Sequence, residues 1–410
     1  MKRRVVITGI GALSCLGNNA LCQYHASVDA ISGITELPVM SGVPPVQTKI
    51  VGKITGNLPN LLDNSTLKMF DQVSHIGWYA VHEAIAQAGL DSLREEDLFR
   101  SGIFWGTGLG GATTIEETYD DLFLKKKGRA KPYTVIGVMA NSTAALLSMK
   151  TKFQGPCITY ATACTSSAHA IGEAFRQILG GYCDRAIAGG SESMNQNAAL
   201  HGWEALRTLA QYDEKKPYAS CKPFSKNRSG FVIGEGSAAL ILESYESAIA
   251  RGANILAEII GYGTTVNGSH ITKPNVMGQA RAIQNALTDA NLSFSEITYV
   301  NAHGTATIIG DIAETESIKL AFGDHANSLL ISSTKAIHGH TFGAAGALEL
   351  IITIQAQING VAPPTAFLDE ADPECNLNFI PNQAVEIPIK YAMSNSFAFG
   401  GSNVVIITKV

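Results

Sequence analysis

Short apolar and β-branched runs alternate with segments of helical periodicity along nearly the whole chain, and this alternation restricts the fold more than any other sequence feature. The expected strands are Val5 to Ile7, Ser101 to Trp105, Cys157 to Tyr160, Arg185 to Ala188, Ser237 to Leu242, Ala257 to Tyr262, Tyr299 to Asn301, Leu329 to Ser332 and Val404 to Thr408. Apolar residues three and four positions apart predict core helices at Ser74 to Ala88, Thr165 to Leu179, Met277 to Ala290 and Ala345 to Ile358. The pattern predicts an α/β protein with largely buried strands between layers of helices.

Two features indicate how these layers are organised. A strand, a turn of small residues and a helix surround Cys164, and a comparable unit spans residues 335–346, which indicates that two halves meet. The weakly periodic stretches Leu109 to Val138 and Ser191 to Ser229 are too long for ordinary connections, so we expect caps, lids or interface elements there.

Composition and charge exclude several classes of protein. Only 16% of the 410 residues are charged, against about 25% in an average soluble domain, which predicts a compact body with a large core. The formal charge of −5 and the lack of a basic block beyond Lys125 to Lys127 argue against nucleic-acid binding. The lysine triplet itself is read as a solvated loop, with attraction of an acidic partner as the alternative.

The cysteines and the apolar runs predict a cytoplasmic protein. Seven cysteines, an odd number without CxxC pairs, argue against a disulfide framework or a structural zinc site and fit a reducing cytosol. No apolar run approaches the roughly 18 residues needed to cross a bilayer. The apolar stretch that begins at Val5 is read as a buried strand and not as a signal peptide.

Cys164 is the first candidate for chemistry. The segment Ile158 to Gly172 predicts a strand, a tight turn and an amphipathic helix that opens at Cys164. Unpaired N–H groups and the positive end of the helix dipole favour a thiolate over a thiol at such a position. A small buried cysteine of the core is the alternative.

His303 is the second candidate. It follows the expected strand that ends at Asn301, and open α/β folds bind ligands at the carboxyl ends of their strands. Thr305 and Thr307 offer hydroxyl groups beside it. A structural histidine in a turn is the alternative.

A glycine-rich turn carries Lys335 and His340 ahead of a helix. Glu349, on that helix, is placed to form a buried ion pair with Lys335. A phosphate-binding loop is the competing interpretation, but the chain contains neither GxxxxGK[ST] nor GxGxxG.

The segment Asn395 to Asn403 places two phenylalanines in a turn that ends in glycine. Phe399, beside Gly400 and Gly401, can swing at little backbone cost, as a gate over an apolar tunnel would. A pair of core phenylalanines is the alternative.

Together, the motifs TACTSSAHA, NAHGTAT, STKAIHGHTFGAAG and NSFAFGG resemble, in order and spacing, the elongating type I/II β-ketoacyl-[acyl-carrier-protein] synthases of the thiolase-like superfamily. The similarity extends from Val5 to the C-terminus. The resemblance implies a thiolase-like fold, in which two duplicated halves, residues 1–250 and 251–410, form a five-layer αβαβα sandwich. It also implies a dimer, made either with itself or with a related ketosynthase-like subunit.

The implied activity is a decarboxylative Claisen condensation that extends a Cys164-bound acyl chain by two carbons from malonyl-acyl-carrier protein, in fatty-acid or aryl polyene/polyketide-type biosynthesis. Both substrates would arrive on the phosphopantetheine of acyl-carrier protein, with no bound cofactor and no metal. Cys164 would be the nucleophile, and His303 and His340 would donate hydrogen bonds to the enolate oxygen. The other implied assignments are Lys335 as orienting catalytic residue, the N–H groups of Cys164 and Phe399 as oxyanion hole, Phe399 as gate, Thr272, Thr305 and Thr307 on the phosphopantetheine arm, Leu109 on the acyl-pocket wall, and Asp311, Glu314 and Glu349 as a supporting network.

Three positions depart from the usual motifs: Ala306 where Ser is common, His338 where Thr is common and Ala398 where Gly is common. None removes a catalytic atom. Ala398 is expected to stiffen the gate, which leaves both fatty-acid elongation and a dedicated polyene pathway open.

Two other functions compete with this assignment. A chain-length factor is a synthase-like subunit without the nucleophile, and the retained Cys164, His303 and His340 argue against it. A CoA-dependent thiolase uses a second cysteine near the C-terminus, but Cys375 lies outside the NSFAFGG turn.

Overall fold

A ten-stranded sheet runs through the computed structural model, which describes residues 3–37, 44–56, 58–90 and 93–410. The strand order is β10-β9-β13-β14-β8-β1-β7-β6-β4-β5. The strands of this sheet are β1 (Val5–Ser14), β4 (Ser101–Gly106), β5 (Cys157–Tyr160), β6 (Arg185–Glu192), β7 (Gly236–Ser244), β8 (Ala257–Val266), β9 (Tyr299–Asn301), β10 (Leu330–Ser332), β13 (Tyr391–Phe397) and β14 (Ser402–Lys409). Short pairs are formed by β2 (Thr35–Glu36) with β3 (Ile50–Val51) and by β11 (Val361–Ala362) with β12 (Val385–Glu386).

The strands separate into two groups along this sheet. Those that precede residue 250 occupy one side, those that follow it occupy the other, and the groups meet where β1 pairs antiparallel with β8. Every expected strand is present. The sequence did not predict β13, which runs parallel to β9 and antiparallel to β14, because its central residues Ser394, Asn395 and Ser396 are polar although buried.

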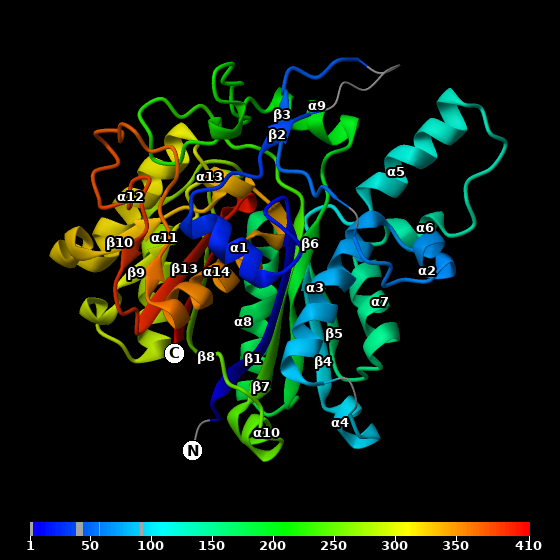
Figure 1. Cartoon of the computed structure of the whole chain (residues 1–410), viewed down its shortest axis with the longest axis horizontal. Coiled ribbons are helices and arrows are strands. Elements are labelled where there is room, and N and C mark those ends of the chain that lie inside the picture. Colours follow the sequence, from blue (N-terminus) through cyan, green and yellow to red (C-terminus); the bar gives the residue numbers. More distant parts are fainter. Residues whose placement is uncertain (1–2, 38–43, 57, 91–92) are drawn as a thin grey trace.

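The helices form three layers around the two strand groups (Figure 1). The main ones are α1 (Ala20–Val28), α3 (Gln72–Ala88), α7 (Ser142–Thr151), α8 (Ser166–Leu179), α11 (Val276–Ala290), α12 (Ile308–Phe322) and α14 (Ala345–Asn359). In the middle, α8 and α14 pack against each other and against strands of both groups. On the outside, α3 covers β1 and β7, while α11 covers β8 and β14. This arrangement is the αβαβα sandwich of the thiolase fold, as predicted.

The four predicted core helices agree with α3, α8, α11 and α14 to within two residues at each end. They form where predicted because each has an apolar face to bury, and α14, in the central layer, is buried along residues 345–357. Shorter helices complete the fold: α2 (Asn64–Met69), α4 (Glu95–Phe99), α5 (Ala112–Tyr119), α6 (Thr134–Val138), α9 (Asn197–Ala205), α10 (Tyr245–Ala250) and α13 (Lys335–His338).

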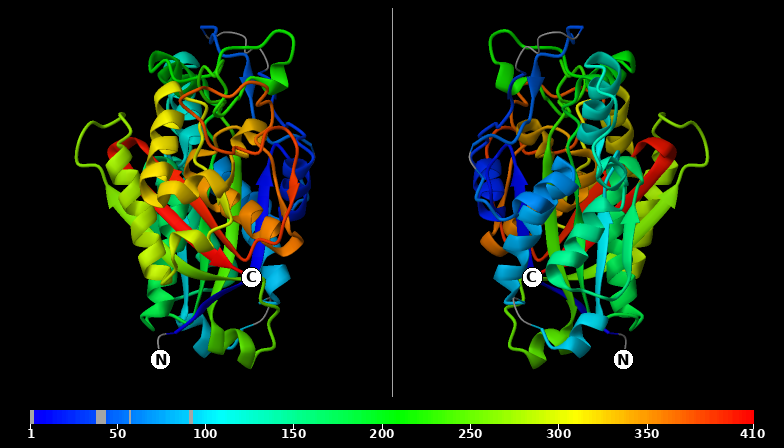
Figure 2. Two further views of the ribbon diagram at one scale, coloured as in Figure 1. Left: turned by 90° about the vertical axis from the view of Figure 1, so that its left-hand side faces the viewer. Right: turned by 90° about the vertical axis from the view of Figure 1, so that its right-hand side faces the viewer.

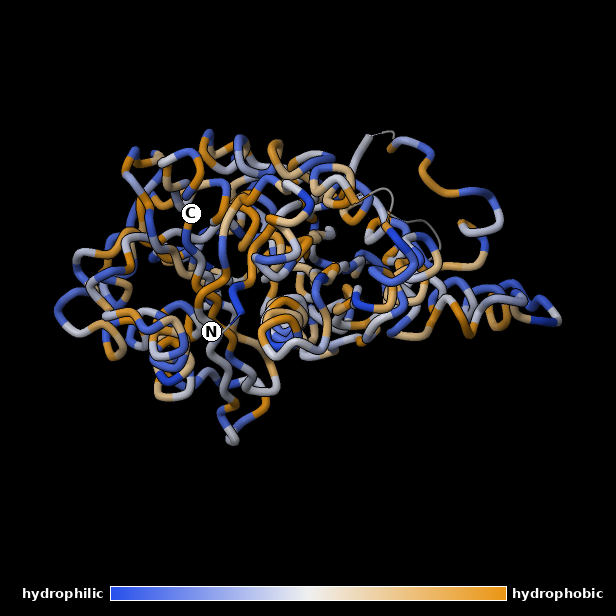
Figure 3. Tube along the Cα trace, turned by 90° about the horizontal axis from the view of Figure 1, so that it is seen from below, coloured by the Kyte–Doolittle hydropathy of each residue, from blue (hydrophilic) through white to orange (hydrophobic). Residues whose placement is uncertain are grey.

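In the side views, the long strands extend roughly along the vertical direction, from one end of the molecule toward the other (Figure 2). Helix α10 lies at one end, and β2, β3 and α9 lie at the other (Figure 1). Hydrophobic stretches are most frequent toward the middle of the tube (Figure 3), and an arm that carries α5 and α6 projects to one side (Figure 1).

This arm is the first of the two long, weakly periodic stretches. It contains α5, a π-helical turn (Asp120–Leu124) and α6, and it exposes Tyr119, Phe123, Leu124 and Val135. Its role as a cap or interface element stays a prediction. Within the described ranges, no helix has the length and hydropathy needed to span a membrane.

Candidate active site

The turn that carries Cys164 is held in a strained conformation. Between β5 and α8, residues Ala163–Thr165 form a 3₁₀ turn, and Ala163 has φ +53°, which is unfavourable for a residue with a Cβ. The Ser166 hydroxyl closes the turn by donating to the Ala163 carbonyl at 2.7 Å and accepting from the Thr162 N–H at 2.9 Å. Cys164 therefore lies in the 3₁₀ turn two residues before α8 begins at Ser166, whereas the sequence predicted a helix that opens at Cys164 itself.

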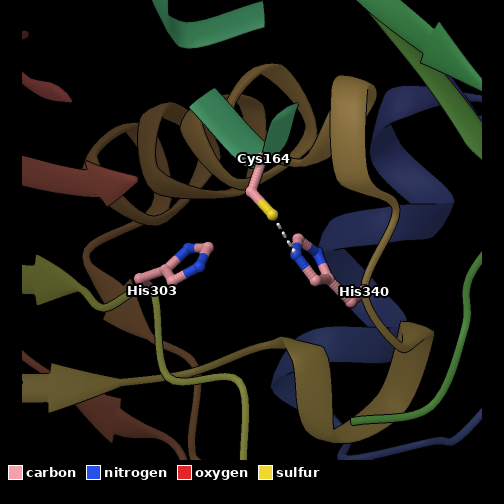
Figure 4. Close-up of side chains that lie close together, drawn as sticks. All are labelled: Cys164, His303 and His340. Carbon is pink, nitrogen blue, oxygen red and sulfur yellow. Dashed lines mark hydrogen bonds between the residues drawn. The ribbon is translucent and has the colours of Figure 1, made fainter. Parts of the chain in front are cut away.

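Two imidazoles from the other half of the chain converge on this cysteine (Figure 4). His340 Nε2 lies 2.9 Å from Cys164 Sγ. The His303 ring stands nearly perpendicular to that of His340, with centroids 5.4 Å apart. All three side chains are buried, with 8%, 1% and 8% of Cys164, His340 and His303 exposed. The two halves of the sheet thus bring together the residues that the separate motifs predicted.

The protonation of the site differs from the expectation of a resting thiolate. Burial raises the pKa of the Cys164 thiol to about 12, more than Lys335 and the N–H groups of Cys164 and Phe399 lower it. Burial and Lys335 hold the pKa values of His303 and His340 well below the usual histidine range. At neutral pH a protonated thiol therefore faces two neutral imidazoles, and the short helix-terminal turn does not by itself ionise the sulfur.

Two backbone N–H groups, those of Cys164 and Phe399, are positioned to donate hydrogen bonds to the Cys164 sulfur. Because the N–H groups of Cys164 and Phe399 each lower the pKa of the thiol, both lie close to the sulfur. An anion that forms at an atom bonded to this sulfur would meet the same donors.

Lys335 and Glu349 form an ion pair behind the imidazoles. The Lys335 ammonium donates to a carboxylate oxygen of Glu349, and neither side chain is exposed. Lys335 begins α13 and Glu349 lies in α14, so the pair connects the histidine turn to the central helix layer. Neither residue lines the cavity described below.

Glu314 and Asp311, both on α12, hold the turn that carries His303. Glu314 accepts hydrogen bonds from the N–H groups of His303 and Gly304 at 2.8 and 2.7 Å. Asp311 accepts from the Phe224 N–H at 2.7 Å. Both carboxylates are buried, which raises their pKa values, that of Asp311 to about 7.

Two buried charged residues of this region were missed by the sequence analysis. Arg228 donates to the carbonyls of Thr307 and Ile308 at 3.1 and 2.7 Å and to the Asp372 carboxylate at 2.6 Å. Glu192 accepts from the N–H groups of two glycine turns that approach each other, at Gly108 and Gly343. Neither lies in a recognisable motif, and their burial depends on distant segments.

A cavity of about 390 Å³ opens onto the cysteine. It is lined by the predicted residues Cys164, Thr272, His303, Thr305, Thr307, Asp311, Glu314, His340 and Phe399 and by Trp203, Phe231, Phe342 and Gln279, among others. Leu109 is not among the lining residues, and its side chain is 52% exposed. Its placement on an acyl-pocket wall stays a prediction.

The gate segment Phe399–Gly401 has a hinge at its glycines. Gly400 and Gly401 adopt φ +84° and +78°, and a Cβ at Gly400 would meet no atom within 4 Å. Ala398 has the extended angles φ −129° and ψ 157°, which any residue adopts. The alanine that replaces the usual glycine therefore introduces no backbone strain.

The donor set Cys164, His303 and His340 also resembles a metal site, because one atom of each lies within 4.8 Å of the others. Zinc prefers sulfur and imidazole ligands. Bound zinc would, however, occupy the sulfur lone pair that a nucleophile needs, so the two chemistries exclude each other at this site.

Comparison with protein families gives two matches that follow each other along the chain. Residues 2–248 match the β-ketoacyl synthase N-terminal domain, and residues 256–369 match the β-ketoacyl synthase C-terminal domain. The chain is 41% identical to nodulation protein E of Rhizobium meliloti (strain 1021) over 415 residues, covering all of both chains. It is 37% identical to 3-oxoacyl-[acyl-carrier-protein] synthase 2 of Staphylococcus aureus (strain COL), covering 100% of this chain and 98% of the relative.

Solved structures agree along the whole chain. A type II PKS acyl-carrier protein in complex with its ketosynthase, bound to the hexaketide, matches with a TM-score of 0.91 at 30% identity over 100% of both chains. The ishigamide ketosynthase/chain length factor matches with a TM-score of 0.92 at 30% identity over the same coverage.

Proposed function

Because the chain belongs to the β-ketoacyl synthase family, we propose that it extends an acyl chain bound to Cys164 by two carbons taken from malonyl-acyl-carrier protein. It is an elongating ketosynthase and hence an acyltransferase. The observation that carries the assignment of its catalytic residues is the convergence of a thiol and two neutral imidazoles at one cavity.

The first step is acyl transfer. The Phe342 N–H donates to His340 Nδ1 at 3.3 Å, so the neutral ring carries its proton on Nε2, which faces Cys164 Sγ at 2.9 Å. The thiol loses its proton to solvent, and the thiolate, which accepts a hydrogen bond from this Nε2–H, attacks the carbonyl carbon of the incoming thioester. The tetrahedral oxyanion accepts hydrogen bonds from the N–H groups of Cys164 and Phe399. The carbon–sulfur bond of the carrier then breaks, and the departing thiolate takes a proton from solvent. Acyl-Cys164 and free carrier thiol result.

The second step is condensation. Malonyl thioester loses CO₂, and the electron pair of the broken C–C bond forms an enolate whose oxygen accepts hydrogen bonds from His303 and His340. These rings donate without adding charge because their lowered pKa values keep them neutral. The enolate carbon then attacks the acyl carbon of acyl-Cys164, the bond between that carbon and sulfur breaks, and the Cys164 thiolate takes a proton from solvent. Lys335 and Glu349 orient the histidine turn during this step.

Recognition of the carried substrate is assigned to the polar side of the cavity. Thr305 and Thr307 hydroxyls lie 3.1 Å apart, and Thr272 lines the same cavity. These hydroxyls suit the amides of a phosphopantetheine arm. The proposal includes no bound cofactor and no metal ion, because the reaction needs only the thiol, the imidazoles and the carrier-bound substrates.

Acyl-carrier protein and a second ketosynthase-like subunit are the partners of this chain. The structural relatives include a ketosynthase bound to its acyl-carrier protein and a ketosynthase paired with a chain length factor.

We further propose a division into two units at residue 250, which the strand order supports, and a cytoplasmic location, which seven free cysteines suit. The alternative role of chain-length factor is disfavoured by the retained Cys164.

One experiment tests the proposal directly. The purified protein is incubated with acyl-carrier proteins that bear saturated and polyenoic chains, with and without malonyl-acyl-carrier protein, and both protein and products are analysed by mass spectrometry. We expect an acyl adduct on Cys164 and β-ketoacyl products two carbons longer. The control Cys164→Ala should give neither. If Cys164 is never acylated, alone or with a partner subunit, the chain is a chain-length factor. Condensation of acetyl-CoA without malonyl thioester would instead indicate a thiolase.

A further inference from the structure

A stack of aromatic rings runs from the catalytic imidazole to the gate. Phe342 lies over the His340 ring, with centroids 4.5 Å apart and planes at 26°, and Trp203 lies over Phe342 at 4.9 Å and 26°. Trp203 in turn faces Phe399 at 6.1 Å and 32°. All four side chains line the cavity that opens onto Cys164. An acyl group on that sulfur therefore has flat ring faces beside it.

The Trp203 ring is held in place by its neighbours. Phe231 meets it edge to face at 5.5 Å and meets Phe342 in the same manner at 5.6 Å. Phe342 itself adopts φ +43° and is buried, a strained conformation that the surrounding packing must maintain. One wall of the slot is thus rigid.

The opposite wall is movable. Carbon surfaces in contact are about 3.5 Å apart, so a planar group between two parallel rings needs about 7 Å between their planes. The Trp203 and Phe399 rings, with centroids 6.1 Å apart and planes tilted by 32°, are too close to admit one without movement of Phe399. Phe399 precedes Gly400, where the positive φ and the empty space around the missing Cβ allow a small rotation. Such a rotation would open the slot to the width of a planar group.

We propose that Trp203 and Phe399 hold a planar, conjugated segment of the acyl chain between them, and that Trp203 makes the enzyme select conjugated over saturated chains. This inference rests on the proposed function, since it assumes an acyl chain bound to Cys164. Conjugated segments stack on aromatic faces as rings do. They also lose fewer torsional states on binding than saturated chains, which must be fixed in a plane.

The test compares two acyl-carrier protein substrates of equal carbon number, one with a conjugated polyenoyl chain and one fully saturated. The ratio of their kcat/KM values is measured for the wild type and for Trp203→Leu, which removes the ring. We expect the wild type to prefer the conjugated chain, and Trp203→Leu to lower this preference about fivefold. Trp203→Phe, which keeps a ring, should retain most of it.

Leu206→Ala is the matched control, because Leu206 lines the same cavity without an aromatic ring. It should change kcat/KM for both chains alike. Equal use of both chains by the wild type, or equal losses in Trp203→Leu, would overturn the inference while leaving the ketosynthase assignment intact. Absence of condensation with either chain would contradict the proposed function instead.

A second readout does not depend on turnover. Acylation of Cys164 by a polyenoyl group should quench tryptophan fluorescence in the wild type, and acylation by the saturated chain should not. In Trp203→Phe, which keeps the other tryptophans, Trp78 and Trp105, the quenching should largely disappear. Quenching that survives unchanged in this variant would place the conjugated chain elsewhere.

Discussion

His340 Nε2 lies 2.9 Å from Cys164 Sγ, although 176 positions separate the two residues in the chain. The imidazole has a lowered pKa and the thiol a raised one, so the proton remains on sulfur until a substrate arrives. The same imidazole therefore contacts the sulfur before acylation and is proposed to donate to the enolate oxygen during condensation.

Replacement of His340 by alanine should affect the two steps differently. Acylation of Cys164 should slow about tenfold at pH 7, because the thiolate loses the hydrogen bond from His340 Nε2–H, and it should recover as a higher pH raises the thiolate fraction. Condensation should fall by about 10²–10³-fold at every pH, since an enolate donor is lost. Acylation is measured by mass spectrometry under single-turnover conditions and condensation by product formation. If the rates of acylation and condensation fell equally and with the same pH dependence, His340 would not be a donor to the enolate oxygen.

The pH dependence of cysteine alkylation reports the protonation of the site. Because burial raises the Cys164 pKa to about 12, the thiolate fraction at pH 7 is small and grows about tenfold per pH unit. The rate of Cys164 modification by iodoacetamide should therefore keep rising beyond pH 9, with no plateau near the value of a free thiol. Peptide mapping distinguishes Cys164 from exposed Cys157. A plateau near pH 7 would show that the sulfur rests as a thiolate.

Removal of one member of the buried Lys335–Glu349 pair should destabilise the protein strongly. Lys335→Ala leaves the Glu349 carboxylate without its partner in a site that is 0% exposed, at a cost of about 3–5 kcal/mol. The double variant Lys335→Met/Glu349→Leu should regain much of that stability in urea unfolding, yet remain inactive in condensation. If the double variant were active, the pair would have a structural role only.

Removal of metal ions should not affect condensation, whereas added zinc should inhibit it. Prolonged treatment with a chelator should leave condensation unchanged, because the mechanism uses the free thiol. Added Zn²⁺ should inhibit and should protect Cys164 from alkylation, because the three donor atoms lie within 4.8 Å of one another. Protection should be lost in His303→Ala. Loss of activity on chelation, restored by zinc, would assign the site to metal catalysis.

The sequence determined the local structure and indicated which residues to propose as reactive. Apolar periodicity placed α3, α8, α11 and α14 to within two residues, since each helix buries a face that its own sequence encodes. The motifs named Cys164, His303 and His340 because the chemistry requires those side chains. The polar strand β13 escaped detection because its burial depends on strands β9 and β14, which are distant or follow it in the chain.

Only the tertiary structure decided how these residues act. The pKa of Cys164 depends on its dielectric surroundings, which segments from both halves of the chain create, and burial raises it although the helix terminus alone would lower it. The burial of Arg228 against the Thr307 turn and the contacts of Trp203 with Phe342 and Phe399 likewise arise from contacts between distant segments. Sequence periodicity predicts which face of a segment is buried. The residues that pack against that face depend on the packing of the whole chain, which brings distant segments together.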